Sequence, residues 1–158
     1  MKSRLRQLKT DASYHVSGKI NRGEIIFDNK SIKTLFLDVV KRCKKKYSFS
    51  IENFVITGNY TRFIIHPRKN ASLPKIMQWI NSVFAKSYNK KMGIKGRLWQ
   101  ERYFSVIIET MEQFVNTFEY TVKNPLSAKL VTDARDYQDS GLYHYLHKIE
   151  GIIDTGFI

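Results

Sequence analysis

The order of hydrophobic patterns along the chain predicts an α+β fold. Stretches in which apolar and polar residues alternate indicate strands, and stretches with apolar residues every three or four positions indicate amphipathic helices. They follow one another as strand, helix, strand, strand, helix and strand, at residues 12–20, 31–47, 49–57, 60–66, 73–92 and 106–108. This order is typical of a ferredoxin-like antiparallel sheet with helices on one face. A C-terminal helix that bears Tyr120 follows the sheet.

The first predicted helix and the hairpin after it have clear local markers. The helix at 31–47 has apolar residues at helical spacing, namely Ile32, Leu35, Phe36, Val39, Val40 and Cys43. Lysine and arginine residues are concentrated at its end, where they complement the helix dipole. Their number exceeds that need, and the remaining basic residues could contact phosphates. The strands at 49–57 and 60–66 are separated by Gly58-Asn59, which indicates a hairpin turn. Pro67 is predicted to end the second strand.

The second helix and the last strand are predicted to complete the core. The buried side of the 73–92 helix consists of Ile76, Trp79, Ile80, Val83 and Phe84. Trp99, in the segment that follows, is predicted to be a packing residue. The apolar run at 106–108 predicts a short buried strand.

The helix that bears Tyr120 has a marked start. Thr110 is a good N-cap, and Gln113 completes a capping box. Apolar residues at helical spacing predict a buried stripe, which comprises Met111, Phe114, Val115, Phe118 and Val122. Tyr120 and Asn124 fall on the opposite, outward side and are one turn apart. Both side chains can therefore contact the same group. Pro125 is predicted to end the helix.

Composition predicts one basic globular domain. The chain has 158 residues and a formal net charge of +13, which favours a polyanionic partner, and nucleic acid is commoner than a membrane surface for such domains. Residues 1–11 are predicted to form a basic arm, and residues 12–158 a single domain. Cys43, the single cysteine, excludes an internal disulfide and is predicted to be a passive core thiol. Without a transmembrane run or a signal peptide, we expect no membrane partner and a cytoplasmic protein.

Two motifs in the second half of the chain resemble a known family. The stretch YTVKNPLSAKLV, which begins at Tyr120, and GRLWQERYFSVII, which begins at Gly96, are similar to segments of the single-tyrosine (HUH-type) transposases, most closely of their REP-associated branch. The resemblance implies that Tyr120 attacks a phosphate of single-stranded or hairpin DNA and forms a 5′-phosphotyrosine link. It also implies that Asn124 helps to hold a divalent metal, Mg²⁺ or Mn²⁺, and that the protein is a monomer or homodimer. From spacing alone, a half-exposed surface aromatic is the commoner interpretation of Tyr120.

The chain departs from the family where the metal is usually held. The family has a His-x-His motif on the second hairpin strand, and Tyr60 and Arg62 stand at those two positions. Tyrosine is a poor ligand for these metals, and a guanidinium has no lone pair to give. The resemblance therefore implies a DNA-binding protein whose strand cleavage is weakened or lost. A relocated metal site formed by His66, His15 and Asn124 is an alternative, although His15 could simply face a neighbouring strand.

Other basic, aromatic and histidine residues suggest further contacts. The predicted DNA-binding residues are Arg62, Lys90, Lys91, Lys95, Arg97, Arg102 and Lys123. For Arg97 and Arg102, a role in surface solubility is almost equally compatible with the sequence. The alternative function is an RNA-binding ferredoxin-like module without catalytic activity, in which Tyr60, Phe63 or Phe54 stacks bases on the open sheet. His144 and His147, three residues apart, are interpreted as a surface pair and not as metal ligands.

Overall fold

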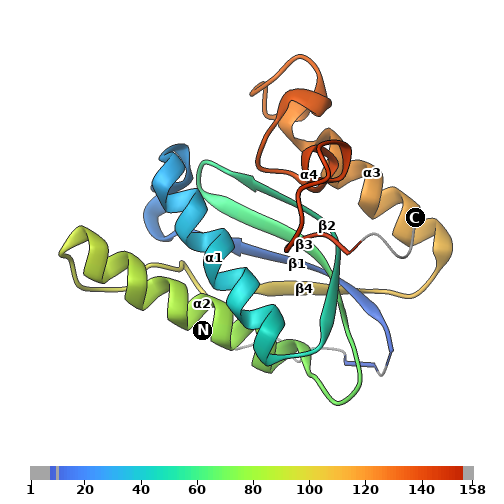
Figure 1. The fold of residues 1–158 in the computed structure, drawn as a ribbon, viewed down its shortest axis with the longest axis horizontal. Helices are drawn as coiled ribbons and strands as arrows, with labels where there is room; N and C mark the ends of the chain where they lie inside the picture. Colours follow the sequence, from blue (N-terminus) through green and yellow to red (C-terminus); the bar gives the residue numbers. More distant parts are fainter. Residues whose placement is uncertain (1–7, 10, 155–158) are drawn as a thin grey trace.

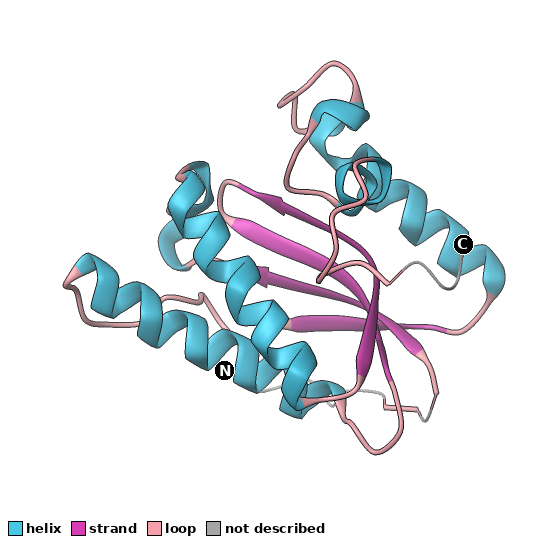
Figure 2. Ribbon diagram, viewed as in Figure 1, coloured by secondary structure: helices cyan, strands magenta, loops and turns pink. Residues whose placement is uncertain are grey.

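A computed structural model of the protein describes residues 8–9 and 11–154 (Figure 1; Figure 2). The elements agree closely with the predicted order. They are β1 (Ser13–Lys19), α1 (Lys30–Lys46), β2 (Phe49–Thr57), β3 (Tyr60–Pro67), α2 (Leu73–Met92), β4 (Phe104–Ile108), α3 (Met111–Ser127) and α4 (Gly141–Leu146), with short 3-10 helices at Asn21–Gly23, Ile26–Asp28 and Ala134–Asp136. Residues 1–7 and 10 lie outside the described residues, so the basic arm and the division at residue 12 remain predictions.

The four strands form one antiparallel sheet in the order β2-β3-β1-β4, which confirms the predicted ferredoxin-like fold. β1 lies in the middle and pairs with β3 on one side and β4 on the other. In this register Ser17 is opposite both Arg62 and Phe104, and His15 is opposite both Ile64 and Val106. Directly paired residues point to the same face of a sheet, so these rows place side chains from three strands side by side.

One face of the sheet is covered by α1 and α2, which build the core (Figure 1). The ring of Phe36 from α1 lies 6.0 Å from that of Phe63 on β3 and 4.9 Å from that of Phe84 on α2. Trp99 is 9% exposed and packs against both helices, which confirms its predicted packing role. Cys43 is also buried in this core, and burial raises the pKa of its thiol to about 12, so it remains protonated.

The tyrosine helix α3 lies against the opposite face of the sheet. Successive residues of a strand point to opposite faces. Because Phe63 packs against α1, its neighbour Arg62 points away from α1, and its guanidinium contacts Tyr120 of α3. Asn53 of β2 is also on this side and donates a hydrogen bond to Phe118 O at 3.4 Å. The sheet is thus sandwiched between two core helices and the helix that bears the candidate site.

The predicted buried stripe of α3 was wrong for Met111 and Val115, whereas Phe114, Phe118 and Val122 are half-buried. Met111 is 75% exposed and Val115 is 44% exposed, whereas the buried residues of the helix are Thr121, Asn124 and Pro125. The physical reason is that this face of the sheet carries polar side chains such as Arg62. Buried polar groups need polar partners, so the helix turns its threonine and asparagine face towards the sheet.

Pro125 does not end α3, which continues to Ser127. A proline removes one backbone donor and is costly in the middle of a helix, but Pro125 lies in the last turn, where little helix follows it. The N–H of Ala128 still donates to Asn124 O at 2.9 Å, and the N–H of Leu130 donates to Pro125 O at 2.9 Å. These bonds close the helix beyond the proline.

The C-terminal segment covers the β2 edge of the sheet. The N–H of Ile56 donates to Asp139 O at 3.0 Å, and Lys44 at the end of α1 forms an ion pair with Asp154. Part of the basic cluster at this helix end is therefore structural. His144 was predicted to lie at the surface, but it is 6% exposed and its ring meets the edge of Phe54 at 5.0 Å, because α4 closes over β2. His147 is exposed, as predicted.

β4 was predicted to be buried but is a half-exposed edge strand. Phe104 is 52% exposed and Val106 is 48% exposed, because they point to the face that α1 and α2 do not cover. α3 packs chiefly against β2 at the far side of the sheet. Within residues 8–9 and 11–154, no helix is long and apolar enough to cross a membrane.

Candidate functional site

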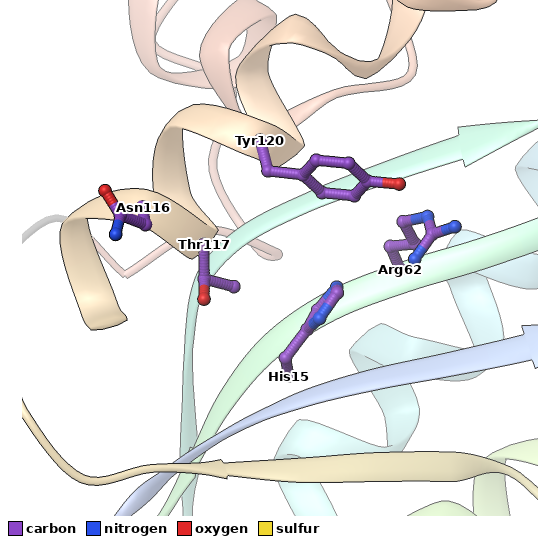
Figure 3. Close-up of a pocket in the computed structure, with 5 residues that line it drawn as sticks. All are labelled: His15, Arg62, Asn116, Thr117 and Tyr120. Atoms are coloured by element: carbon purple, nitrogen blue, oxygen red, sulfur yellow. The ribbon is translucent and has the colours of Figure 1, made fainter. Parts of the chain in front are cut away.

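An open pocket of about 350 Å³ lies between α3 and the polar face of the sheet (Figure 3). Its lining comes from three elements that are distant in sequence. β1 contributes His15, β3 contributes Arg62, and α3 contributes Asn116, Thr117 and Tyr120. The pocket exists because the small, polar face of α3 is held against a sheet face that also carries polar side chains.

Arg62 lies beside the pocket with a tyrosine on each side. Its guanidinium carbon is 4.8 Å from the ring centroid of Tyr60 and 5.2 Å from that of Tyr120, and both distances are within the range of cation–π attraction. The Nε atom of Arg62 is buried and has no hydrogen-bond partner among the described residues. A permanent positive charge is therefore fixed in a defined position, with at least one donor unused.

Tyr60 also forms a partly buried hydrogen bond with Asn124. The Tyr60 hydroxyl donates to Asn124 Oδ1 at 3.2 Å. Burial acts to raise the pKa of the Tyr60 phenol, but its polar surroundings and the nearby Arg62 charge outweigh burial, so the pKa lies below its usual value. The prediction that Asn124 points outward was wrong, since this residue is only 5% exposed. Its amide serves to anchor α3 to β3.

Tyr120 stands over the guanidinium at the mouth of the pocket. It is 51% exposed, and its hydroxyl extends over the pocket on the side of Arg62 (Figure 3). Its ring meets that of His15 edge-on, with centroids 6.3 Å apart and planes at 75°. Tyr120 is thus held clear of the core, in contact with both a cation and an imidazole.

His15 faces the pocket from the central strand. Its Nε2 atom is buried without a hydrogen-bond partner among the described residues. Desolvation by burial, followed by the charge of Arg62, lowers the pKa of His15 to about 4. The imidazole is therefore neutral near pH 7, and its Nε2 has an unused lone pair or N–H beside the pocket.

With the geometry established, comparison with known proteins identifies the family. Residues 9–124 match the family model described as "Transposase IS200 like". The chain belongs to the IS200-like transposase family. This result confirms the resemblance to the single-tyrosine transposases.

Two solved structures share the fold of this IS200-like transposase. A REP-associated tyrosine transposase bound to a REP hairpin superposes with a TM-score of 0.80 at 16% identity, covering 99% of this chain and 92% of that one. A protein described as a transposase, from Deinococcus radiodurans R1, superposes with a TM-score of 0.53 at 11% identity, covering 78% of this chain and 97% of that one. No curated protein matches the chain. At these identities the likeness establishes the fold and not the chemistry.

The residues of this IS200-like transposase do not fit the metal that the family implies. At the two positions that the resemblance assigns to the His-x-His motif, Tyr60 is bonded to Asn124 and Arg62 carries a charge that repels a cation. The relocated site is not assembled either. His66 Nδ1 is 2.9 Å from Ser13 Oγ and its Nε2 is 2.8 Å from Asp11 Oδ1, while His15 points into the pocket. Across the part of the chain that the structure describes, no three His, Cys, Asp or Glu side chains are grouped to hold a metal.

The basic residues that are predicted to bind DNA fall into two groups in this transposase. Arg62 lines the pocket, whereas the other six are exposed: Lys90, Lys91, Lys95, Arg97, Arg102 and Lys123. The loop after α2 is joined to the sheet, since the N–H of Asn21 donates to Leu98 O at 2.7 Å. The adjacent N–H of Ile20 donates to Asn59 O at 2.8 Å. This basic loop therefore lies at the same end of the sheet as the β2–β3 turn that precedes Tyr60.

The sheet residues expected for RNA stacking are not available for it. Phe54 is fully buried and Phe63 is 2% exposed, and both belong to the core under α1. Only Tyr60 of that predicted set lies on the pocket face. Sequence reasoning also missed Thr117 as a pocket residue, because it shares a helical face with Thr121 and Asn124, and that face carries no apolar signal.

The low pKa of His15 predicts a pH dependence of stability. Below its usual pKa of 6.5, the unfolded chain binds a proton at His15 that the folded protein excludes until about pH 4. Stability should therefore fall as pH is lowered from about 6.5 to 4, by a total on the order of 3 kcal/mol from this group. Urea unfolding at several pH values would measure it in the parent and in His15→Gln. His144, whose pKa is also lowered, contributes equally to both proteins, so a constant difference between them over this range would contradict the assignment.

Proposed function

We propose that this IS200-like transposase binds single-stranded or hairpin DNA, with Arg62 receiving a backbone phosphate beside Tyr120 and with strand cleavage weak or absent. The observation that carries the proposal is the guanidinium of Arg62 between the rings of Tyr60 and Tyr120, at the edge of an open pocket. Arginine recognises phosphate through charge-assisted hydrogen bonds. A DNA-bound structure with the same fold, the REP-associated transposase, supports DNA as the partner.

The charge distribution supports a backbone contact that extends beyond the pocket. The net charge of +13 favours any polyanion, and the basic loop and Lys123 are exposed near the end of the sheet where β3 begins. Phosphate contacts position nucleic acid without reading its sequence. Arg62 would then bind one phosphate, and the exposed lysine and arginine side chains would bind the neighbouring phosphates of the strand.

Cleavage would require Tyr120 to act as a nucleophile. Its oxygen would form a bond to phosphorus, the P–O3′ bond would break, the phenol would lose its proton, and O3′ would gain one. Stabilisation of the charge that develops on the phosphoryl oxygens is worth several kcal/mol in enzymes that use a metal for it. In this protein Arg62 would have to stabilise that charge, as arginine does in other phosphoryl-transfer reactions. A single guanidinium supports binding better than rapid turnover.

The binding proposal predicts a steep dependence on salt. Fluorescence anisotropy with a labelled DNA hairpin that carries a single-stranded flank should give an affinity that falls with salt, with a log–log slope of about −3 to −5 for five to seven phosphate contacts. The same affinity is expected in EDTA and in Mn²⁺. An affinity that does not change with salt would contradict the proposal, and a preference for RNA of the same sequence would favour the RNA-binding alternative.

The proposal about cleavage predicts at most a trace of covalent product. Incubation of the protein with a 3′-labelled single strand and Mn²⁺, followed by denaturing electrophoresis, should show little or no protein–DNA adduct. Any adduct that forms should disappear in Tyr120→Phe, which keeps the ring over Arg62 but lacks the nucleophilic oxygen. Rapid, complete adduct formation that depends on Mn²⁺ would show that the site is catalytically intact and would overturn this part of the proposal.

A further inference from the structure

A bare apolar strip adjoins the pocket on the same face of the sheet. Phe104 and Val106 of β4 are 52% and 48% exposed. Their strand partners on β1 are Ser17 and His15, and Ser17 is in turn paired with Arg62 on β3. The residues Arg62, Ser17 and Phe104 therefore form one row across the sheet, with their side chains on the face that carries Tyr120.

The spacing within this row is set by the sheet. Neighbouring strands lie about 4.8 Å apart, so the backbone of Phe104 is about 10 Å from that of Arg62. A short length of single-stranded DNA can bridge this separation, with a phosphate at one end and a base at the other. Figure 1 shows that α3 rises from the end of β4 towards β2, so it leaves the beginning of β4 open.

The chemistry of the strip selects a nucleobase over other occupants. Every base has a π-face that can stack on an aromatic ring whatever the sequence, and single-strand binders combine such rings with a basic track for the backbone. A second copy of this chain would bring another net charge of +13 to the same surface, which opposes association through it. DNA compensates that charge and also covers the exposed ring.

We infer that Phe104, flanked by Val106, stacks on an unpaired base of the DNA strand whose phosphate is held at Arg62. The inference rests on the proposed DNA-binding function and adds a second contact to it, on the base and not on the backbone. According to this inference, the single-stranded flank of a hairpin crosses the sheet, and the duplex stem does not.

The test compares Phe104→Ala with the parent on a hairpin that carries a single-stranded flank. Loss of one stacked base should weaken binding by about 5- to 50-fold. The salt slope should not change, because no phosphate contact is removed. Phe104→Trp should bind at least as tightly as the parent. Leu146→Ala, which truncates a side chain of similar exposure (47%) on α4, is the matched control and should bind as the parent does.

A second measurement follows the DNA base itself. A flank with 2-aminopurine at successive positions should show, at one position, fluorescence quenched by the parent protein and not by Phe104→Ala. If the parent binds DNA with the expected salt slope but Phe104→Ala binds equally well and no position is quenched, this inference is wrong and the proposed function stands. If the parent binds no DNA, both fail. Dissociation of a parent dimer by Phe104→Ala, with DNA affinity unchanged, would assign the strip to self-association and overturn the inference.

Discussion

Replacement of Arg62 by alanine is expected to weaken binding of single-stranded or hairpin DNA by about 10- to 100-fold. Among the residues predicted to bind DNA, Arg62 is the one that lines the pocket. Its guanidinium lies between the rings of Tyr60 and Tyr120, so it is preorganised to bind a phosphate. The complex should therefore lose the charge-assisted hydrogen bonds of a preorganised donor. The slope of log affinity against log salt concentration should become less steep by the contribution of about one phosphate contact. Anisotropy titrations over a range of salt concentrations measure both quantities.

Two variants separate this effect from general electrostatics. Arg62→Lys keeps the charge but loses the planar donor pair, and should recover only part of the affinity. Arg102→Ala removes an exposed cation outside the pocket and should cost only a few-fold. Removal of Arg62 also takes away one cause of the low pKa of His15, so its NMR titration should shift upward. If Arg102→Ala and Arg62→Ala weaken binding equally, the pocket has no special role.

Conversion of Tyr60 and Arg62 together to histidine is expected to create a divalent metal site that the parent lacks. The two positions are separated by one residue on β3 and point to one face, and the amide of Asn124 already lies 3.2 Å from the Tyr60 hydroxyl. Two imidazoles and an amide oxygen provide a ligand set for Mn²⁺. Calorimetry should show saturable binding at one site in Tyr60→His/Arg62→His and none in the parent. Adduct formation at Tyr120 with Mn²⁺ should rise by about 100-fold or more.

The matched control for this gain is Tyr60→Gln/Arg62→Gln, which removes the same side chains without adding imidazoles. It should bind no metal and form no additional adduct. Addition of Asn124→Ala to the histidine pair should weaken metal binding, and addition of Tyr120→Phe should abolish the adduct while metal binding remains. Equal metal binding by the glutamine and histidine pairs would show that the metal is held elsewhere.

Much of the fold could be predicted because it depends on local patterns. The bounds of β2 and α2 agree with their predicted ranges, and the capping box at Thr110 forms as expected. Strand alternation was also sufficient to place Tyr60 and Arg62 on one face. The family followed from the Tyr120 motif and was confirmed by the family match over residues 9–124.

The errors share one physical cause. Helical spacing tells which residues share a face, but not which face finds a partner. The apolar residues Met111 and Val115 remained in solvent because α3 turns Thr121 and Asn124 towards the sheet, where Asn124 is bonded to Tyr60. The run at 106–108 was predicted to be a core strand, but the place of β4 at the sheet edge left Val106 exposed.

By itself, the sequence determined the order of the elements and the family, and its resemblance to that family predicts an aromatic residue and a cation at the two metal-ligand positions. Only the tertiary structure decided that Arg62 lies between two tyrosine rings and that His15 faces Tyr120. It also decided that Phe104 extends the same surface. These contacts join β1, β3, β4 and α3, and their formation depends on sheet register and helix docking. Neither is encoded by the periodicity of a single segment, because both result from burial of the whole chain.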